Sequence, residues 1–410
     1  MYTCRVCVFC LIFTFGIVPK SVNFFQVKTT CRKLHNIVKS VLILDEVQTL
    51  PREYLQPIVD SLDTLVRVFG VSVLFTTASQ PVLSGHLQGT NPFVSFNGLP
   101  SIKELIPRGA NLHEKLRRVE LKFDDVKKDY DDIAAEMVEK TRVLCIVNTR
   151  NDAKEIYTRL PKEGSLFHLS RMMCPGHIGE VIARIKDVLK QEPSTIVRVV
   201  ATQLIEAGVD IDFPVVLRQE SGLDSILQAA GRCNREGTLK CGETRVFCLD
   251  KPLPPGYISD ANNARLNMKG EYDWFSPEAM EAYFLQLYSR ASTFDKPEIA
   301  QLLYKSDMQF ETAASVFHLI DDTTIPVIVN WKNSMELVER LKREGVSYPL
   351  MKKLSQYTVN VRERDLKILY GAGAIEEILE GVYTLCDAGY YDGEVGLRVE
   401  NNWLEESLIV

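Results

Sequence analysis

Short runs of aliphatic residues recur along the chain, and each of them ends in polar side chains. Between several of these runs the apolar positions follow the spacing of an amphipathic helix, as at 131–140, 152–160 and 178–191. A strand, a polar loop and then a helix form the repeating unit of a parallel sheet. The pattern therefore predicts an α/β fold with strands at 41–44, 71–75, 142–147, 165–170, 197–201 and 215–218.

Two carboxylates, Asp45 and Glu46, directly follow the first of these strands. Open parallel sheets bind ligands at the carboxyl ends of their strands, where an aspartate can hold Mg²⁺ and a neighbouring glutamate can activate a water that attacks a γ-phosphate. The hydroxyl residues Thr77 and Ser79 follow the next strand and can form hydrogen bonds at the same edge. Taken alone, a solvated acidic turn and a capped turn explain the two segments as well.

The segment 224–237 predicts a helix with a polar face. Gln228, Arg232 and Arg235 stand at i, i+4 and i+7, so one side of such a helix presents an amide and two guanidinium groups. Arginine suits bidentate contact with phosphate and the stabilisation of transition-state charge. The alternative is an ordinary ion pair between Arg232 and Glu236.

A glycine and an acidic residue follow the strand expected at 197–201. Thr202 opens a helical turn, and Gly208 then permits a close backbone approach ahead of Asp210. Asp210 can equally well cap a turn, so this segment alone does not decide between a site and a loop.

Breaks in the pattern divide the chain. Residues 91–110 are loop-rich, 251–256 has the composition of a linker, and helical stretches then run to about residue 318. From residue 324, short alternating runs predict a small α+β domain. We therefore expect new units to begin near residues 115, 251 and 324.

Composition sets the outer limits. The chain has 410 residues, of which 46% are hydrophobic and 25% charged, so it is globular, with two or three domains at about 150 residues each. A net charge of -6 argues against a wholly basic nucleic-acid coat, while local phosphate contacts stay open. Ten scattered cysteines favour a reducing, cytoplasmic compartment over a disulfide framework.

The amino-terminal segment needs its own interpretation. Its apolar stretch at 6–18 is too short to span a bilayer, which takes about 20 residues, so no membrane association is expected. Cys4, Cys7 and Cys10 lack a fourth ligand nearby, which favours chance composition over a metal site. A buried strand or helix, a cryptic signal peptide and a start in a damaged or misread part of the gene stay open, and we favour the last.

Four motifs occur in an order that resembles superfamily 2 helicases and, more narrowly, the CRISPR-associated helicase of type I systems. They read LDEVQ at 44–48, TASQP at 77–81, VATQLIEAGVD at 200–210 and QAAGRCNREG at 228–237. The Gln-x-x-Gly-Arg-x-x-Arg signature in this company is highly specific. The resemblance runs from about residue 29 to the carboxy terminus. It implies two RecA-like parallel-sheet lobes, of which the first, at 29–114, is incomplete and the second lies at 115–250. It further implies an atypical leader at 1–28, a linker and helical region at 251–323, and a small carboxy-terminal α+β accessory domain at 324–410.

The resemblance also implies a role for each candidate residue. Asp45 corresponds to the Mg²⁺-binding carboxylate and Glu46 to the base that orients the hydrolytic water. Gln228, Arg232 and Arg235 correspond to the polar face that closes over ATP, with Arg235 as the arginine finger. The other implied roles are coupling of hydrolysis to strand movement at Thr77 and Ser79, contacts to the DNA backbone at Asn148, Thr149 and Thr202, and the junction of nucleotide site and strand at Gly208 and Asp210.

Two parts of the family pattern are missing from the sequence. There is no G-x-x-x-x-G-K-[ST] loop and not one Gly-Lys dipeptide, so ATP and Mg²⁺ are expected to bind weakly or not at all. None of the six histidines is followed by aspartate, so the family's His-Asp nuclease is not expected. Both parts would precede residue 41 in the family's order, which predicts an amino-terminally truncated, frame-shifted or split gene product.

Three functions stay open. The first, implied by the resemblance, is an ATP-dependent translocase or helicase on single-stranded DNA in CRISPR antiviral interference, recruited by a CRISPR-RNA-guided surveillance complex. It would work once a separate chain supplies the phosphate-loop and nuclease segments. The second is a non-catalytic module that binds DNA or the surveillance complex, and the third is an inactive gene remnant.

Overall fold

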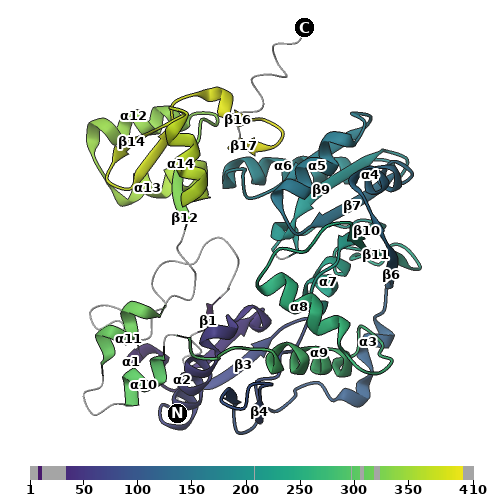
Figure 1. The fold of residues 1–410 in the computed structure, drawn as a ribbon, viewed down its shortest axis with the longest axis vertical. Helices are drawn as coiled ribbons and strands as arrows, with labels where there is room; N and C mark the ends of the chain where they lie inside the picture. The colour runs from purple at the N-terminus through teal and green to yellow at the C-terminus, as the bar shows by residue number, and fades with distance from the viewer. Residues whose placement is uncertain are drawn as a thin grey trace, which may run out of the picture. The chain divides into compact units, whose positions relative to one another are not determined.

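The computed structural model describes residues 8–11, 34–206, 208–296, 298–304, 309–317 and 324–399. The chain divides into two compact units, each of which is described by itself (Figure 1). Unit 1 comprises Met1–Arg117, Glu220–Gln228 and Leu253–Ile320, and unit 2 the other residues. Apart from the strand β1 (Val8–Leu11), the leader expected at 1–28 lies outside the described residues. The prediction that its cysteine run is no metal site therefore stays untested.

Unit 1 contains a parallel three-stranded sheet in the order β1-β2-β3. The runs expected at 41–44 and 71–75 form β2 (Val41–Asp45) and β3 (Ser72–Thr76). The amphipathic helix α2 (Leu55–Arg67) connects these strands and buries its apolar stripe in the core of the unit. Because β2 and β3 are parallel and in register, Asp45 lies opposite Thr76 at their shared carboxyl edge.

The other elements of unit 1 are mostly short. They are α1 (Leu34–Ile37), β4 (His86–Gln88), β5 (Ser95–Asn97), α3 (Leu112–Lys115), α8 (Tyr257–Leu266), α9 (Pro277–Ser289), α10 (Ile299–Tyr304) and α11 (Phe310–Val316). The amino-terminal part of α7 (Leu223–Ala230) also belongs here. The Asp224 carboxylate there accepts hydrogen bonds from Tyr283 Oη at 2.7 Å and Tyr257 Oη at 3.1 Å, which hold the first turn of α7 against α8 and α9.

Unit 2 is built on a six-stranded parallel sheet in the order β6-β11-β10-β7-β9-β8. The central strands carry continuous aliphatic runs because both of their faces are buried. The parallel α/β fold expected from the sequence is thereby confirmed. The elements are β6 (Val119–Lys128), α4 (Tyr130–Val138), β7 (Arg142–Val147), α5 (Arg150–Arg159), β8 (Ser165–Leu169), α6 (Pro175–Leu189), β9 (Val197–Thr202), β10 (Val215–Gln219) and β11 (Gly242–Leu249).

Residues 324–399 add a mixed four-stranded sheet in the order β13-β12-β15-β14, and their α+β character agrees with expectation. The elements are β12 (Thr324–Ile328), α12 (Ser334–Glu344), α13 (Tyr348–Leu354), β13 (Thr358–Arg362), α14 (Glu363–Gly371), β14 (Ile375–Leu379), β15 (Val382–Leu385), β16 (Tyr391–Asp392) and β17 (Gly396–Leu397). Throughout the described ranges, no helix is both long and apolar enough to cross a membrane.

The β16–β17 hairpin packs against the start of α6 within unit 2. The Cys174 N–H donates to Tyr391 Oη at 3.0 Å, and His177 Nδ1 lies 3.0 Å from the same oxygen. The His177 ring stacks on Trp331 with ring centroids 3.9 Å apart. These buried polar and aromatic contacts join the accessory region to the six-stranded sheet.

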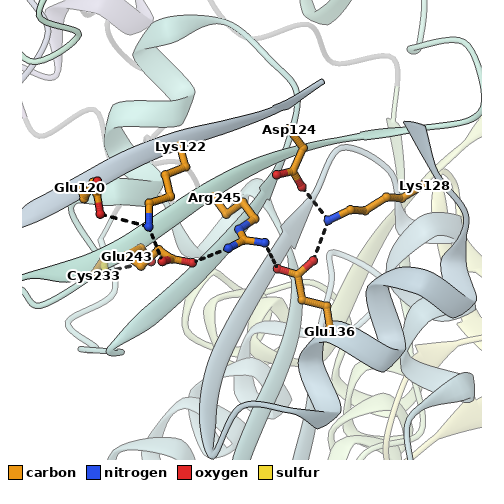
Figure 2. Close-up of polar contacts among 8 residues, drawn as sticks. All are labelled: Glu120, Lys122, Asp124, Lys128, Glu136, Cys233, Glu243 and Arg245. Carbon is orange, nitrogen blue, oxygen red and sulfur yellow. Dashed lines mark hydrogen bonds and ion pairs between the residues drawn. The ribbon is translucent and has the colours of Figure 1, made fainter. Parts of the chain in front are cut away.

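A ladder of alternating charges runs across the edge strand β6 and its neighbour β11 to Glu136 of α4 (Figure 2). Lys122 Nζ lies 2.8 Å from Glu243 and 3.1 Å from Glu120, while Arg245 lies 3.0 Å from Glu243 and 3.2 Å from Glu136. The hydrogen bond from Lys122 holds the pKa of Glu243 below its ordinary value. Since β6 is a long edge strand, charged side chains along it disfavour pairing with another chain. We therefore interpret the ladder as structural.

A histidine in unit 2 is buried without a polar partner. His168 of β8 is 3% exposed, and neither ring nitrogen has a hydrogen-bond partner among the described residues. Its ring meets Tyr157 edge-on at a centroid distance of 5.4 Å. Burial lowers the pKa of His168 to about 4, so the folded protein keeps this side chain neutral.

We expect His168 to make unit 2 sensitive to acid. Its folded-state pKa of about 4 lies below the ordinary value of about 6.5, so the unfolded chain takes up the proton first as the pH falls. Stability should therefore decline from pH 6.5 towards pH 4, by about 3 kcal/mol at the limit. Urea unfolding at a series of pH values tests this. His168→Leu should flatten the decline, the exposed-site control His86→Gln should retain it, and an equal decline in His168→Leu would contradict the account.

Candidate functional site

Asp45 occupies the carboxyl end of β2, beside Thr76 of β3. Its Oδ1 atom accepts hydrogen bonds from the Thr76 hydroxyl and, at 3.1 Å, from the Glu46 N–H. Within the described residues, Oδ2 has no hydrogen-bond partner. The carboxylate is thus held at one oxygen while the other oxygen is available to a ligand.

Glu46 stands in a tight turn directly after β2. Its backbone is left-handed, with φ 53° and ψ 44°, a conformation that a residue with a Cβ adopts at an energetic cost. The Glu46 carbonyl accepts hydrogen bonds from the Thr49 N–H at 2.9 Å and the Thr49 hydroxyl at 2.7 Å. This turn fixes where the carboxylate leaves the sheet edge.

Gln48 links the Glu46 carboxylate to the hydroxyl residues that follow β3. Its side chain is buried, its amide nitrogen donates to Glu46 Oε2, and its carbonyl oxygen accepts from the Thr77 hydroxyl. Thr77 Oγ1 in turn accepts the Ser79 N–H at 3.1 Å. The structure thus brings together four predicted residues, Asp45, Glu46, Thr77 and Ser79, through Thr76 and Gln48, which the sequence analysis missed. Thr76 could have been found from the parallel pairing of the two predicted strands, which sets it opposite Asp45.

The residues of unit 1 fit a magnesium nucleotide only in part. Asp45 offers one free carboxylate oxygen, as Mg²⁺ prefers. In the described part of the chain, no group of three or more His, Cys, Asp or Glu side chains could enclose a metal. The sequence also provides no phosphate loop. Further ligands would therefore have to be water or phosphate, as Mg²⁺ commonly has.

In unit 2, the predicted residues Asn148, Thr149 and Thr202 lie at the carboxyl ends of the adjacent parallel strands β7 and β9. The Thr149 side chain caps α5 by accepting the Asp152 N–H at 3.1 Å. Thr202 ends β9 with its side chain largely buried, and its hydroxyl forms no hydrogen bond within the described residues. Thr149 therefore has a structural task in addition to any contact with a ligand.

Asn148 is held by groups that the sequence analysis did not select. Its Oδ1 accepts from Arg218 Nη1 at 2.8 Å, and its N–H donates to Gln219 Oε1 at 2.8 Å. Arg218 of β10 is fully buried and forms an ion pair with Glu206, with Nε 2.9 Å from Oε1. An arginine directly after the aliphatic run 215–217 of a buried strand was the signal that could have found it.

The helix expected over 224–237 is wrong in extent. Helix α7 ends at Ala230, and the chain then turns through Asn234 at φ 45°. The backbone of Phe213 forms an isolated β-bridge with that of Cys233, so the segment after α7 does not continue the helix. Gln228, Arg232 and Arg235 therefore do not share one helix face, and Gln228 is grouped with unit 1 whereas both arginines belong to unit 2.

The two arginines have different surroundings. Arg232 is buried, and its guanidinium donates to the carbonyl oxygens of Ile205, at 3.0 Å, and Glu206, instead of forming the alternative pair with Glu236. Arg235 is 46% exposed and pairs with Asp210, with Nε 2.8 Å from Oδ1. Asp210 thus forms an ion pair at the surface.

Two further features shape the same loops. Gly208 has φ 72° and open space where a Cβ would stand, so its backbone, not crowding, requires glycine. Asp212, which the sequence analysis did not select, accepts the Arg235 N–H at 2.7 Å and the Glu236 N–H at 3.3 Å. Asp212 therefore fixes the turn that carries Arg235.

A family sequence profile described as "CRISPR-associated nuclease/helicase Cas3, C-terminal" matches residues 139–238. Two proteins named "CRISPR-associated nuclease/helicase Cas3" are also similar. The one from Methanothermobacter thermautotrophicus is 26% identical over 211 residues, which covers 50% of this chain and 25% of that protein. The one from Haloferax volcanii is 49% identical over 55 residues, which covers 13% of this chain and 6% of that protein.

Solved structures share the fold. A structure of T. fusca Cas3 with ADP superposes with a TM-score of 0.60 at 15% identity, covering 91% of this chain and 55% of that one. A structure described as "CRISPR RNA-guided surveillance complex, pre-nicking" gives 0.55 at 15% identity, covering 92% and 59%. The chain thus spans little more than half of these solved chains. The resemblance to the CRISPR-associated Cas3 family is thereby confirmed: residues 139–238 match its C-terminal profile, Cas3 proteins are similar in sequence, and solved Cas3 structures share the fold.

Proposed function

We propose that the chain is part of an ATP-driven motor that moves along single-stranded DNA in CRISPR interference. The observation that carries this proposal is the carboxylate pair Asp45 and Glu46, tied through Gln48 to Thr77 at one sheet edge. A carboxylate that can hold Mg²⁺ beside one that can orient water is the arrangement that phosphoryl transfer to water needs.

In this proposal Asp45 holds Mg²⁺ and Glu46 orients the attacking water. Bound Mg²⁺ would supply positive charge to the phosphate oxygens. Gln48 keeps the Glu46 carboxylate in place and connects it to Thr77, which with Ser79 couples hydrolysis to movement of the strand. Because no Gly-Lys dipeptide exists in the sequence, the phosphate grip has to come from polypeptide other than these 410 residues.

Unit 2 supplies the other proposed roles, except that of Gln228, which belongs to unit 1. Asn148, Thr149 and Thr202 contact the DNA backbone, and the exposed guanidinium of Arg235 acts as the arginine finger. The other nucleotide-side roles are assigned to Gln228, Arg232, Gly208 and Asp210.

We assign residues 29–114 to the first lobe, 115–250 to the second, 251–323 to a linker and helical region, and 324–410 to the accessory domain. The surveillance complex is the proposed partner, because one structure of similar fold is described as such a complex. Nuclease activity is not assigned to these residues.

A second candidate is a module that binds DNA or the surveillance complex without hydrolysing ATP. The missing phosphate loop favours it, because without that loop the carboxylates of unit 1 face a weakly held nucleotide. The loops of unit 2 that are proposed to bind DNA do not depend on that loop for their conformation.

The motor proposal predicts ATP hydrolysis that depends on Glu46. The chain alone should hydrolyse no ATP. Once mixed with or joined to a polypeptide from the same locus that carries a Gly-x-x-x-x-Gly-Lys-Thr loop, it should hydrolyse ATP faster in the presence of single-stranded DNA. Glu46→Gln should lower that rate about a hundredfold or more, because it removes the proposed base.

The matched control is Glu53→Gln, an exposed glutamate in unit 1 paired with Lys296, which should keep the rate. Steady-state phosphate release measures both variants. Equal rates for Glu46→Gln and the parent would refute the assigned base, and no hydrolysis with the loop supplied would leave the binding module as the function.

The motor and a DNA-binding module, the two candidates that contact DNA, both predict salt-sensitive binding of single-stranded DNA, because phosphate contacts release counterions. The fluorescence anisotropy of a labelled oligothymidylate should report affinity that falls steeply as salt rises. Thr202→Val should weaken binding about fivefold by removing one hydroxyl contact. Thr141→Val, at the opposite end of the sheet just before β7, should not weaken it. Binding that is indifferent to salt would contradict both candidates.

A further inference from the structure

A charged cluster is buried where the strands of unit 2 end. Arg218 of β10 is 0% exposed, and its side chain crosses the carboxyl end of the neighbouring strand β7. Its Nη1 donates to Asn148 Oδ1 at 2.8 Å and to the Gln219 carbonyl at 2.7 Å. On the other side, its Nε lies 2.9 Å from the carboxylate of Glu206, which is 6% exposed.

Glu206 connects this cluster to a second buried arginine. Its carboxylate pairs with Arg218, while its backbone carbonyl accepts a hydrogen bond from Arg232 Nη2. Arg232 Nε also donates to the Ile205 carbonyl at 3.0 Å. One continuous set of contacts therefore joins three loops: the one after β7, the one after β9, and the turn at 231–236.

The chemistry of the cluster suits positioning more than stability. Removing two opposite charges from water costs free energy that their attraction only roughly repays, so apolar side chains of similar size often stabilise a fold equally well. A guanidinium, however, donates several hydrogen bonds in fixed directions, which a lysine cannot reproduce. In this way Arg218 orients Asn148 and Glu206 at the same time.

We propose that Arg218 and Glu206 are positioning residues that couple the DNA-contacting loop at 148–149 to the turn carrying Arg232 and Arg235. This proposal rests on the proposed function, in which those loops contact DNA and the nucleotide. Binding of DNA at Asn148 then restrains Arg218, and through Glu206 it restrains the turn at 231–236.

The test is the double variant Arg218→Met with Glu206→Met in the full 410-residue chain. Replacing both charges leaves neither one buried alone, so the thermal melt should stay cooperative, with its midpoint unchanged or higher. Affinity for the labelled oligothymidylate should nevertheless fall about tenfold, roughly the contribution of one charge-assisted hydrogen bond. A residue needed only for folding would not give that combination.

Hydrogen exchange supplies a second readout. In the parent chain, oligothymidylate should slow amide exchange both at 148–150 and at 231–236. In the double variant, the slowing at 231–236 should be lost. Slowing at 231–236 that survives in the double variant would overturn the coupling.

The matched control is Arg198→Met. Arg198 of β9 is 3% exposed, and its guanidinium donates to the Met137 and Val138 carbonyls at 3.1 Å and 2.8 Å, near the carboxyl end of α4. It is therefore a buried arginine of the same sheet that lies outside the cluster, and its loss should leave DNA affinity unchanged.

The outcomes separate the two proposals. Parent chain that fails to bind the oligonucleotide in a salt-sensitive way contradicts the proposed function itself. Parent and double variant that bind equally well contradict only the positioning role. If the double variant melts without cooperativity, the single variant Arg218→Lys is tested in its place. Weaker DNA binding together with a cooperative melt of that variant supports the proposal. Unchanged DNA binding overturns it.

Discussion

Parallel strand pairing determines the three-stranded sheet of unit 1 and the six-stranded sheet of unit 2. In each unit it brings the carboxyl ends of neighbouring strands to one edge, so that residues far apart in sequence become neighbours. Asp45 meets Thr76 in unit 1 for this reason, and Asn148 lies near Glu206 and Arg218 in unit 2 for the same reason. The candidate chemistry of each unit follows from where its strands end.

Buried polar contacts then fix these edges. In unit 1, Gln48 accepts from Thr77 and donates to Glu46, so one amide side chain ties the carboxylate turn to the loop after β3. In unit 2, the ion pair of Arg218 and Glu206 does the corresponding work for three loops. Buried polar networks of this kind restrict the conformations of a site.

The sequence predicted the six strands that have mainly aliphatic runs, but it did not predict the more polar strands β6 and β11. It placed Asp45, Glu46 and the loops after β7 and β9 at strand ends, as the structure does, while their roles stay predictions. It placed Arg232 and Arg235 incorrectly on a helix, since spacing cannot reveal that Phe213 bridges Cys233 and ends helical geometry. The sequence alone did not point to Thr76, Gln48 or Arg218. Their contacts depend on strand register and on burial, which cannot be read from composition.

In the proposed function, the carboxyl edge of the unit 2 sheet contacts single-stranded DNA. Photocrosslinking of an oligonucleotide that carries photoreactive thymines, followed by mass spectrometry of the crosslinked peptides, tests it most directly. We expect the oligonucleotide to crosslink to residues 148–150 and 202–206. Crosslinks confined to other segments, such as 324–399, would contradict it.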